Sequence, residues 1–551
     1  MKKYHLIIVF LLFAFFGKAE GYRISEDSQN IVGQIDTLFR LSNFPDFKIK
    51  KIDTFFFDGE RERILFATET ETDVYGYTSA EHYVFFISGN RIEQVSEYGK
   101  QQLPVFSSNG RMVAFVREGN IFIKKFDYGT EVAVSEDGGN NILNGVPVWI
   151  YKKEFPAQRY FEWSPDGKML AFVRFDESVV GDYCIDIYPD FDKKLFNPAE
   201  FYPQKRCYKF PVAGSENPKV SLQVYDVQYR STRQLDVSAD EDFYIPHFSW
   251  IPDNGHLAVV TLNRSQKQLN LQFINPKSNV SKNILKETAD SISFDINNVS
   301  KLNFLPNGDF VWQSNYSGIN QQYLYSNIGI LKKQITDISL KNDSLAWCAM
   351  PENFDENEKY PLIILQKSSG TEICTDLMQM FSENGYFVAC LPFDFPEHCI
   401  VEMQKRANIL ACLPYVDSMR IFAFGCGESA AITLLAMSSD SIFKAGIAIA
   451  PITDWRFDNS IRAERYFGRP QENFDAYIQH SPLEQAENLH GKVLLIHGTA
   501  DDNAHLRNTL SYADRLTKLG KPFEMQIYQN AGHEISKEIL YEKILEFLSK
   551  Q

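Results

Sequence analysis

The sequence lacks a surplus of positive charge. Its 551 residues contain 56 Lys and Arg against 71 Asp and Glu, which gives a net charge of -15. A protein that binds nucleic acid through its phosphates needs a basic face. The composition therefore argues against a nucleic-acid partner, while 44% hydrophobic and 23% charged residues are typical of a globular protein.

Long apolar runs are scarce, and the one at the N-terminus is short. Residues 6–16 are apolar, follow Lys2 and Lys3, and precede the small-residue segment 17–19. Spanning a bilayer takes about 20 apolar residues. A basic start, a short apolar core and small residues predict a secretory signal peptide over 1–19 and export to the periplasm or the cell exterior. An uncleaved signal anchor is the alternative.

Cysteine is sparse and irregularly spaced. None of the 8 cysteines forms a C-x-x-C pair, which argues against a zinc site, and no other cofactor is expected. Cys184 and Cys207 share one polar, loop-like segment and are candidates for a disulfide in an exported chain. The remaining cysteines are expected to be buried free thiols. They are Cys348, Cys374, Cys390, Cys399, Cys412 and Cys426.

Aromatic residues are abundant, at 14% with 44 Phe and 27 Tyr, which favours a strand-rich fold. Four segments each contain an aromatic residue, a turn rich in Pro, Asp, Asn or Gly, and an apolar strand, which is a hairpin pattern. They are residues 105–116, 162–173, 249–260 and 303–312. Their blade-sized spacing predicts a β-propeller over 22–345, with an irregular β-sandwich as the alternative.

The pattern changes at about residue 346. A chain of this length needs two or more domains, and continuous apolar strands now alternate with helical segments. The predicted strands are 360–365, 386–391, 421–424, 445–450 and 493–496. Alternation of this kind predicts a parallel sheet covered by helices on both faces over residues 346–551.

Residues 425–429 lie between a predicted strand and a predicted helix. This is the frame of the G-x-S-x-G nucleophile turn of an α/β-hydrolase, but its central residue is Gly427. Asp501 and His533 follow in the Ser, Asp, His order of that fold. The second domain is therefore predicted to be an α/β-hydrolase that has its acid and its base but not its nucleophile.

Three propeller and hydrolase segments, together with the string at 494–505, resemble the dipeptidyl peptidase IV family of the prolyl oligopeptidase clan. The three are 144–155, 161–167 and 463–468, and the resemblance covers nearly all of the mature chain. It implies enzymes that release X-Pro or X-Ala dipeptides from free N-termini. In these enzymes a serine attacks, a histidine takes its proton and an aspartate orients the histidine.

On the propeller side, the resemblance identifies what has changed for the substrate's ammonium group. The first of the two glutamates that bind this group is replaced by Lys153, and Glu154 is retained. A lysine at that place is expected to repel the ammonium. In the hydrolase part, the tyrosine that holds the oxyanion falls near Lys367. In the propeller, the arginine that contacts the substrate carbonyl falls near Val74.

On the hydrolase side, Asp458 and Arg462 replace the two tyrosines that flank the proline pocket, and Asn503 is retained. We expect Asp458 and Arg462 to form an ion pair that fills this pocket. Ser429 lies roughly 200° around the helix from Gly427, so its hydroxyl is not expected to meet His533.

These departures predict a pseudopeptidase with a binding or scaffold role. Its expected partners are peptides or an active family member, and the resemblance implies a homodimer formed through the hydrolase domain. The alternative is an active serine-type exopeptidase or esterase that releases X-Pro or X-Ala dipeptides with a rearranged nucleophile.

Overall fold

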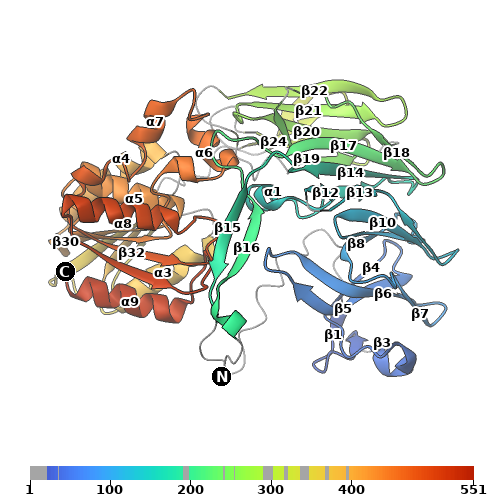
Figure 1. The fold of residues 1–551 in the computed structure, drawn as a ribbon, viewed down its shortest axis with the longest axis horizontal. Helices are drawn as coiled ribbons and strands as arrows, with labels where there is room; N and C mark the ends of the chain where they lie inside the picture. Colours follow the sequence, from blue (N-terminus) through green and yellow to red (C-terminus); the bar gives the residue numbers. More distant parts are fainter. Residues whose placement is uncertain are drawn as a thin grey trace.

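The structure is a computed structural model. In it the chain folds into two parts, an all-β part and an α/β part (Figure 1). The described residues are 21–34, 36–139, 141–189, 198–239, 242–252, 255–289, 294, 302–314, 321–335, 347–366, 371–392 and 396–551. The predicted signal peptide and Lys367 lie outside them.

The first part is built from antiparallel sheets that follow one another along the chain. A three-stranded sheet, β1-β2-β3, precedes sheets β4-β5-β6-β7, β8-β9-β10-β11, β12-β14-β17-β18 with β13 on β14, β19-β20-β21-β22 and β23-β24-β25-β26. The bounds in the first three sheets are β1 Arg23–Ile24, β2 Asn30–Val32, β3 Thr37–Arg40, β4 Thr54–Phe57, β5 Arg63–Thr72, β6 Thr78–Phe86, β7 Arg91–Gln94, β8 Gln102–Phe106, β9 Met112–Arg117, β10 Asn120–Lys125 and β11 Thr130–Ala133. The later strands are β12 Ile142–Asn144, β13 Phe161–Trp163, β14 Met169–Asp176, β17 Lys219–Asp226, β18 Ser231–Gln234, β19 Phe243–Trp250, β20 Leu257–Asn263, β21 Gln268–Asn275, β22 Val280–Thr288, β23 Asn303–Phe304, β24 Phe310–Ser314, β25 Gln321–Tyr325 and β26 Leu331–Gln334.

The repeated sequence segments are the inner hairpins of successive sheets, β8–β9, β13–β14, β19–β20 and β23–β24. The first two of these hairpins close through turns that need a positive backbone φ. Gly110 and Gly167 supply it, both at φ 67°. The apolar strand after each turn is buried between neighbouring sheets, as Val113 to Val116 show. The β-propeller prediction is confirmed.

The second part is a seven-stranded sheet in the order β27-β29-β28-β30-β31-β32-β33, in which β27 is antiparallel and the other strands are parallel. The strands are β27 Trp347–Ala349, β28 Tyr360–Gln366, β29 Phe387–Leu391, β30 Val416–Cys426, β31 Ala445–Ile449, β32 Lys492–Gly498 and β33 Phe523–Tyr528. The helices are α3 Thr371–Glu383, α4 Pro396–Ala411, α5 Glu428–Ser439, α6 Ser460–Phe467, α7 Phe474–Gln479, α8 Arg507–Leu519 and α9 Lys537–Ser549.

Each face of this sheet has its own core. Ile363 and Leu365 pack toward α3 and α9, whereas Leu362 and Ile364 pack toward α4, α5 and α8. Apolar residues at successive positions of β28 are buried because both faces are covered. The α/β-hydrolase prediction is confirmed.

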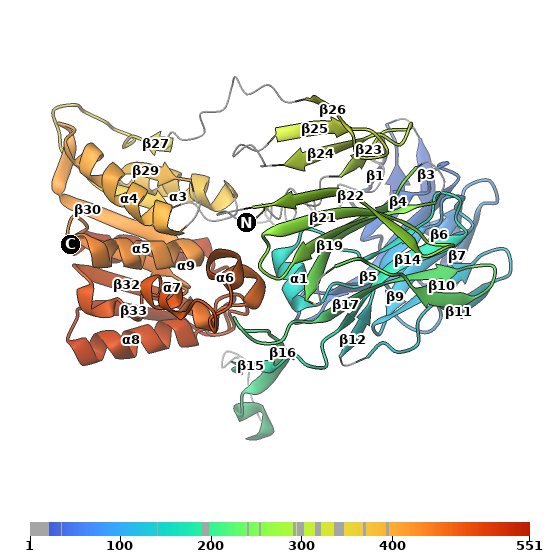
Figure 2. The same cartoon turned by 90° about the horizontal axis from the view of Figure 1, so that it is seen from above.

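Two propeller elements lie against the second part. One is the short helix α1 Trp149–Glu154, which faces α6 in the view from above (Figure 2). The other is the hairpin β15 Asp182–Ile187 and β16 Gln204–Lys209, which extends beside the hydrolase sheet (Figure 1). Short 3-10 turns complete the described elements: Leu41–Asn43, Pro45–Phe47, Pro198–Phe201, Trp455–Phe457 and Ala486–Asn488.

Candidate active site

The turn between β30 and α5 has the backbone of a nucleophile elbow. Gly427 precedes the helix with φ 59° and ψ −120°, and this positive φ favours glycine. A Cβ at Gly425 would lie 2.2 Å from the carbonyl oxygen of Ser429, so this turn also requires glycine there. Such a sharp turn presents residue 427 at the carboxyl edge of the sheet.

Asp501 and His533 form a hydrogen-bonded pair beside this turn. His533 Nδ1 lies 2.8 Å from Asp501 Oδ2, and Asp501 Oδ1 accepts the backbone N–H groups of Asn503 and Ala504 at 2.8 and 3.0 Å. Burial alone would raise the pKa of the Asp501 carboxyl, but His533 and His497 hold this pKa well below its usual range. The carboxylate is therefore ionised and orients the imidazole, as in a hydrolase triad.

A side chain at position 427 would point toward His533. A Cβ built on Gly427 would lie 3.4 Å from His533 Nε2. Ser429 is fully buried, and its hydroxyl donates to the carbonyl of Cys426 at 2.7 Å. Burial raises the pKa of the Cys426 thiol to about 12, so this thiol stays protonated at neutral pH. Neither Ser429 nor Cys426 supplies His533 with a nucleophile in this geometry.

A cluster of charged side chains lies next to Gly427. Arg462 donates to both carboxylate oxygens of Asp458, at 2.7 and 2.6 Å, which is the expected ion pair. Its guanidinium also donates to Asn503 Oδ1 at 3.1 Å and lies 3.5 Å from Glu428 Oε1. Burial raises the pKa values of Glu428 and Asp458, and Arg462 opposes both shifts.

Glu154 reaches this cluster from the propeller. Its carboxylate accepts hydrogen bonds from Asn459 Nδ2 at 2.9 Å and from Arg465 Nη2 at 3.0 Å, and lies 4.0 Å from Arg462 Nε. The Glu154 side chain is only 7% exposed. The carboxylate is therefore held by hydrolase side chains, and nothing in the sequence pattern pointed to Asn459.

Lys153 also contacts the hydrolase part. Its Nζ lies 3.1 Å from Asp502 Oδ1, and Trp149 Nε1 donates to the other oxygen of the same carboxylate at 3.5 Å. Asp502 directly follows Asp501 in the chain. The sequence pattern did not identify this partner, since it lies 349 positions from Lys153. Val74 is exposed, and its carbonyl accepts from Arg206 at 3.1 Å.

The cysteines depart in part from expectation. Cys184 and Cys207 form a disulfide, as the sequence suggested, but they lie opposite each other in the β15–β16 hairpin rather than in a loop. Cys390 is also disulfide-bonded, so the expectation of a free thiol there is wrong. Cys348 and Cys412 are thiols but exposed, because they lie on an edge strand and just after α4. Cys399 is a buried thiol as expected and Cys426 a half-buried one; the Cys374 side chain lies outside the described residues.

The part of the chain that the structure describes contains neither a candidate metal site nor a candidate membrane-spanning helix. This part contains no group of three or more His, Cys, Asp or Glu side chains arranged to hold a metal ion. None of the helices within the described ranges has the length and apolarity needed to cross a bilayer.

Propeller, parallel sheet, elbow and Asp–His pair together define a propeller-bearing protein of the serine-hydrolase fold class. The sequence matches the dipeptidyl peptidase IV N-terminal region over residues 58–350 and the prolyl oligopeptidase family over residues 394–551. The chain therefore belongs to the dipeptidyl peptidase IV family of serine peptidases.

Relatives and solved structures agree with this assignment. "Probable dipeptidyl-aminopeptidase B" of Phaeosphaeria nodorum is 23% identical over 84% of this chain and 69% of its own length. The Aspergillus clavatus protein of that name is 25% identical over 79% of this chain and 65% of its own length. The chain thus spans about two thirds of the length of these relatives. Dipeptidyl peptidase 4 of Porphyromonas gingivalis superposes with a TM-score of 0.87 at 29% identity, covering 97% of this chain and 96% of that one. A "putative dipeptidyl aminopeptidase IV" of Bacteroides ovatus shares the fold at 18% identity, with a TM-score of 0.75 and 96% coverage of both chains.

Proposed function

We propose that this family member is a pseudopeptidase that works by binding rather than by turnover. The observation that carries the proposal is Gly427, which keeps the elbow backbone and faces His533 but has no hydroxyl to attack a carbonyl. Loss of the nucleophile costs roughly a millionfold in kcat in a comparable serine triad. The retained Asp501–His533 pair then fixes a loop rather than activating a serine.

The charged cluster supports the same conclusion from the substrate side. Arg462 and Asp458 occupy positions where the resemblance implies tyrosines, and they are buried and paired. A proline ring is apolar, and burying it against paired ions would leave their remaining polar atoms without water or partners. Glu154, held by Asn459 and Arg465, has little capacity left for a substrate ammonium.

The direct test combines a Gly-Pro chromogenic substrate with a fluorophosphonate probe, which labels activated serines. We expect neither turnover nor labelling of the purified full chain, with an active dipeptidyl peptidase 4 as the positive control. Turnover or labelling that disappears in Ser429→Ala would establish the alternative, an exopeptidase or esterase with a rearranged nucleophile. Against that alternative stands the Ser429 hydroxyl, which donates to a backbone carbonyl.

Export and assembly are further parts of the proposal. The 1–19 pattern supports export, and the family resemblance supports a homodimer in which α9 contributes contacts. Peptides or an active family member are the proposed partners. An intact Met1 found by mass spectrometry in the cytoplasmic fraction would contradict export, and a monomeric mass by light scattering would contradict the dimer. Co-purification from the native cell envelope would identify the partner.

A further inference from the structure

Gly427 leaves a place open in front of the imidazole of His533. Apart from adjacent residues of the chain, a Cβ built on Gly427 would have only this ring within 4 Å among the described residues, with Nε2 at 3.4 Å and Cε1 at 3.5 Å. The ring is reachable, since the His533 side chain is 30% exposed. A small group of a ligand can therefore lie where a longer side chain at residue 427 would place its own terminal atom.

The contacts of His533 determine which ring nitrogen faces this place and in which form. Nδ1 lies 2.8 Å from Asp501 Oδ2, and the Asp501 carboxylate is ionised. An ionised carboxylate only accepts, so Nδ1 carries the hydrogen and Nε2 of the neutral ring carries a lone pair. Nε2 has no hydrogen-bond partner among the residues that the structure describes. It is an accessible acceptor that lacks a donor.

The neighbouring carboxylates offer little to a cationic donor. Arg462 donates to both oxygens of Asp458 and lies 3.5 Å from Glu428 Oε1. Arg465 donates to Glu154 at 3.0 Å. An ammonium group would lose its water beside carboxylates that are already paired, which is costly. A neutral donor needs only the lone pair on Nε2, and an alcohol hydroxyl is a small group of this kind.

We propose that this place binds an alcohol hydroxyl of a ligand, namely the side chain of a serine or threonine in a bound peptide. The ligand hydroxyl donates its hydrogen to His533 Nε2, and no covalent bond forms. This assignment rests on the proposed function, since the peptide must bind without being cleaved. It makes the Asp501–His533 pair a part of the recognition site.

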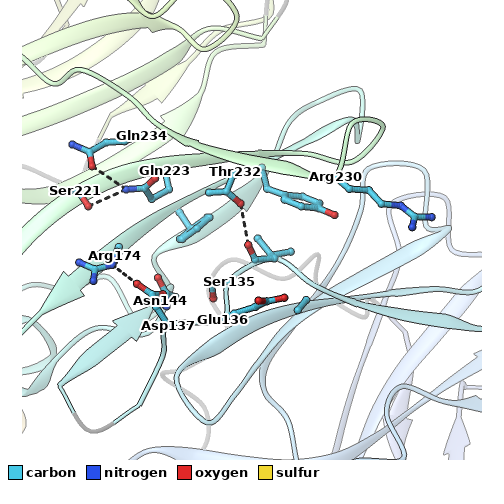
Figure 3. A pocket seen from close by; sticks show the side chains of 14 residues that line it. Ser135, Glu136, Asp137, Asn144, Arg174, Ser221, Gln223, Arg230, Thr232 and Gln234 are labelled. Carbon is cyan, nitrogen blue, oxygen red and sulfur yellow. Dashed lines mark hydrogen bonds and ion pairs between the residues drawn. The ribbon is translucent and has the colours of Figure 1, made fainter.

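The other place considered for a peptide is a cleft of about 660 Å³ between two propeller sheets (Figure 3). Side chains of its walls bond to one another: Gln223 Nε2 donates to Gln234 Oε1 at 3.4 Å, and Arg174 Nε donates to Asp137 Oδ2 at 2.7 Å (Figure 3). This cleft is formed by propeller residues alone. Gln234→Ala is therefore the control variant, because it changes the cleft and leaves the surroundings of His533 intact.

The test titrates the full chain with short peptides of Ala and Gly that carry one serine at each position in turn, measured by calorimetry. In at least one register, the serine peptide should bind about fivefold tighter than its alanine counterpart, the order of one hydrogen bond. O-methylserine cannot donate and should bind like alanine. Gly427→Ala should remove the advantage of serine, since its methyl group would lie 3.4 Å from Nε2. Gln234→Ala should retain it.

Asp501→Asn tests the proton on His533 and serves if Gly427→Ala, at φ 59°, does not fold. The backbone N–H groups of Asn503 and Ala504 donate to Asp501 Oδ1. An asparagine would therefore keep its oxygen there and present its NH2 group to His533 Nδ1, which moves the ring hydrogen to Nε2. In this variant O-methylserine should bind as well as serine, a reversal that a merely structural role of Asp501 would not produce.

Peptides recovered after the titration are analysed by mass spectrometry. Cleaved peptides would contradict the proposed function, whereas intact peptides that bind equally with serine and alanine, or do not bind, would overturn only the present assignment. A gain from 2,3-diaminopropionate larger than that from serine would show that the carboxylates attract a cation. Loss of the serine advantage in Gln234→Ala would move the site to the propeller cleft. Glycerol that binds while no peptide shows a serine advantage would assign the place to free polyols.

Discussion

At Gly427 the backbone keeps the angles of a nucleophile turn although no side chain is presented there. The turn is fixed by its surroundings: Gly427 N–H donates to the Ile449 carbonyl at 2.9 Å, and Gly425 leaves room for the start of α5. Because these contacts are independent of the side chain at residue 427, the fold of the turn does not depend on which side chain is there.

Gly427→Ser is expected to gain fluorophosphonate labelling without useful Gly-Pro cleavage. The new Oγ would extend from a Cβ that lies 3.4 Å from His533 Nε2, within reach of the base. A serine at this positive φ costs about 1–3 kcal/mol of stability, so the variant should still fold. Labelling measured by gel fluorescence should disappear in Gly427→Ser with His533→Ala. Cleavage at family rates would show that the charged cluster does not block substrate.

Glu428→Gln is expected to shift the pH dependence of stability. Burial raises the pKa of Glu428 above its unfolded value, so the native state binds this proton more tightly. The stabilisation is complete below the unfolded pKa of about 4.3 and is lost as pH rises through the folded pKa. The Tm of the Gln variant minus that of the native protein should therefore increase between about pH 4 and about pH 8.

The control for this measurement is Glu538→Gln. Ser536 lowers the pKa of exposed Glu538, so any change in the Tm difference should be small and of opposite sign. Tyr466 Oη donates to Glu428 Oε2 at 3.1 Å, and Arg462 lies 3.5 Å from the other oxygen. A flat or falling difference for Glu428→Gln would mean that these two groups stabilise the carboxylate more than burial destabilises it.

The sequence predicted site residues within a single segment better than it predicted contacts between segments that are distant in the chain. Gly427, Asp501 and His533 follow from motif and order, and the Asp458–Arg462 pair follows from the positions that the family resemblance assigns to these two residues. Glu154 joins that pair only because the propeller places α1 against α6. No local pattern encodes such a contact, which depends on how two domains pack.

Among the elements, the hairpin β15–β16 departs most from its sequence pattern. Its strands are rich in charged and polar residues, and half of their side chains are exposed, so the segment has the pattern of a loop. The hairpin is held by contacts with the hydrolase part: Arg206 Nη2 donates to the Ala500 carbonyl at 2.9 Å, and Tyr208 Oη lies 2.6 Å from His505 Nε2. Near its tip, Tyr188 and Asn530 exchange hydrogen bonds of 2.8 and 2.7 Å.

These contacts connect the hairpin to both loops of the Asp–His pair. Ala500 precedes Asp501, and Asn530 is three residues before His533. The Cys184–Cys207 disulfide joins the two strands beside Tyr183 and Tyr208. The hairpin therefore supports the loops that carry Asp501 and His533 from the propeller side.

Replacing both Cys184 and Cys207 by Ser should destabilise the hairpin and the two loops that it contacts. The disulfide closes a sequence separation of 23 residues, and the chain-entropy model assigns about 3 kcal/mol to a loop of this order. We expect a lower Tm and faster amide exchange at 499–503 and 529–533, measured by mass spectrometry. Cys412→Ser, at an exposed free thiol, is the control and should change neither. Unchanged exchange in these loops would show that the hairpin does not support them.

At the scale of the whole molecule, ion pairs connect the propeller to the hydrolase part. Arg264 donates to both oxygens of Glu464, each at 2.7 Å, and the side chains are 8% and 1% exposed. Lys153 pairs with Asp502 at a more exposed site. The two domains could be predicted from their internal periodicity. Their interface could not, because residues 200 positions apart show no shared periodicity.

Arg264→Met should strongly destabilise this interface. The substitution removes the guanidinium that neutralises the buried Glu464 carboxylate. The Gly214 N–H, which donates to Glu464 Oε1 at 2.7 Å, remains as a donor from the propeller side. Breaking a buried pair in this way costs about 3–5 kcal/mol. We expect calorimetry to show a lower Tm and unfolding of the two parts in separate transitions.

Arg111→Ala is the control, since its pair with Asp127 is exposed and is worth about 0–1 kcal/mol. In a double-mutant cycle, Glu464→Leu should recover much of the stability lost in Arg264→Met, because it removes the unpaired charge. Additive losses would show that the two side chains stabilise the molecule independently and do not tie the parts together.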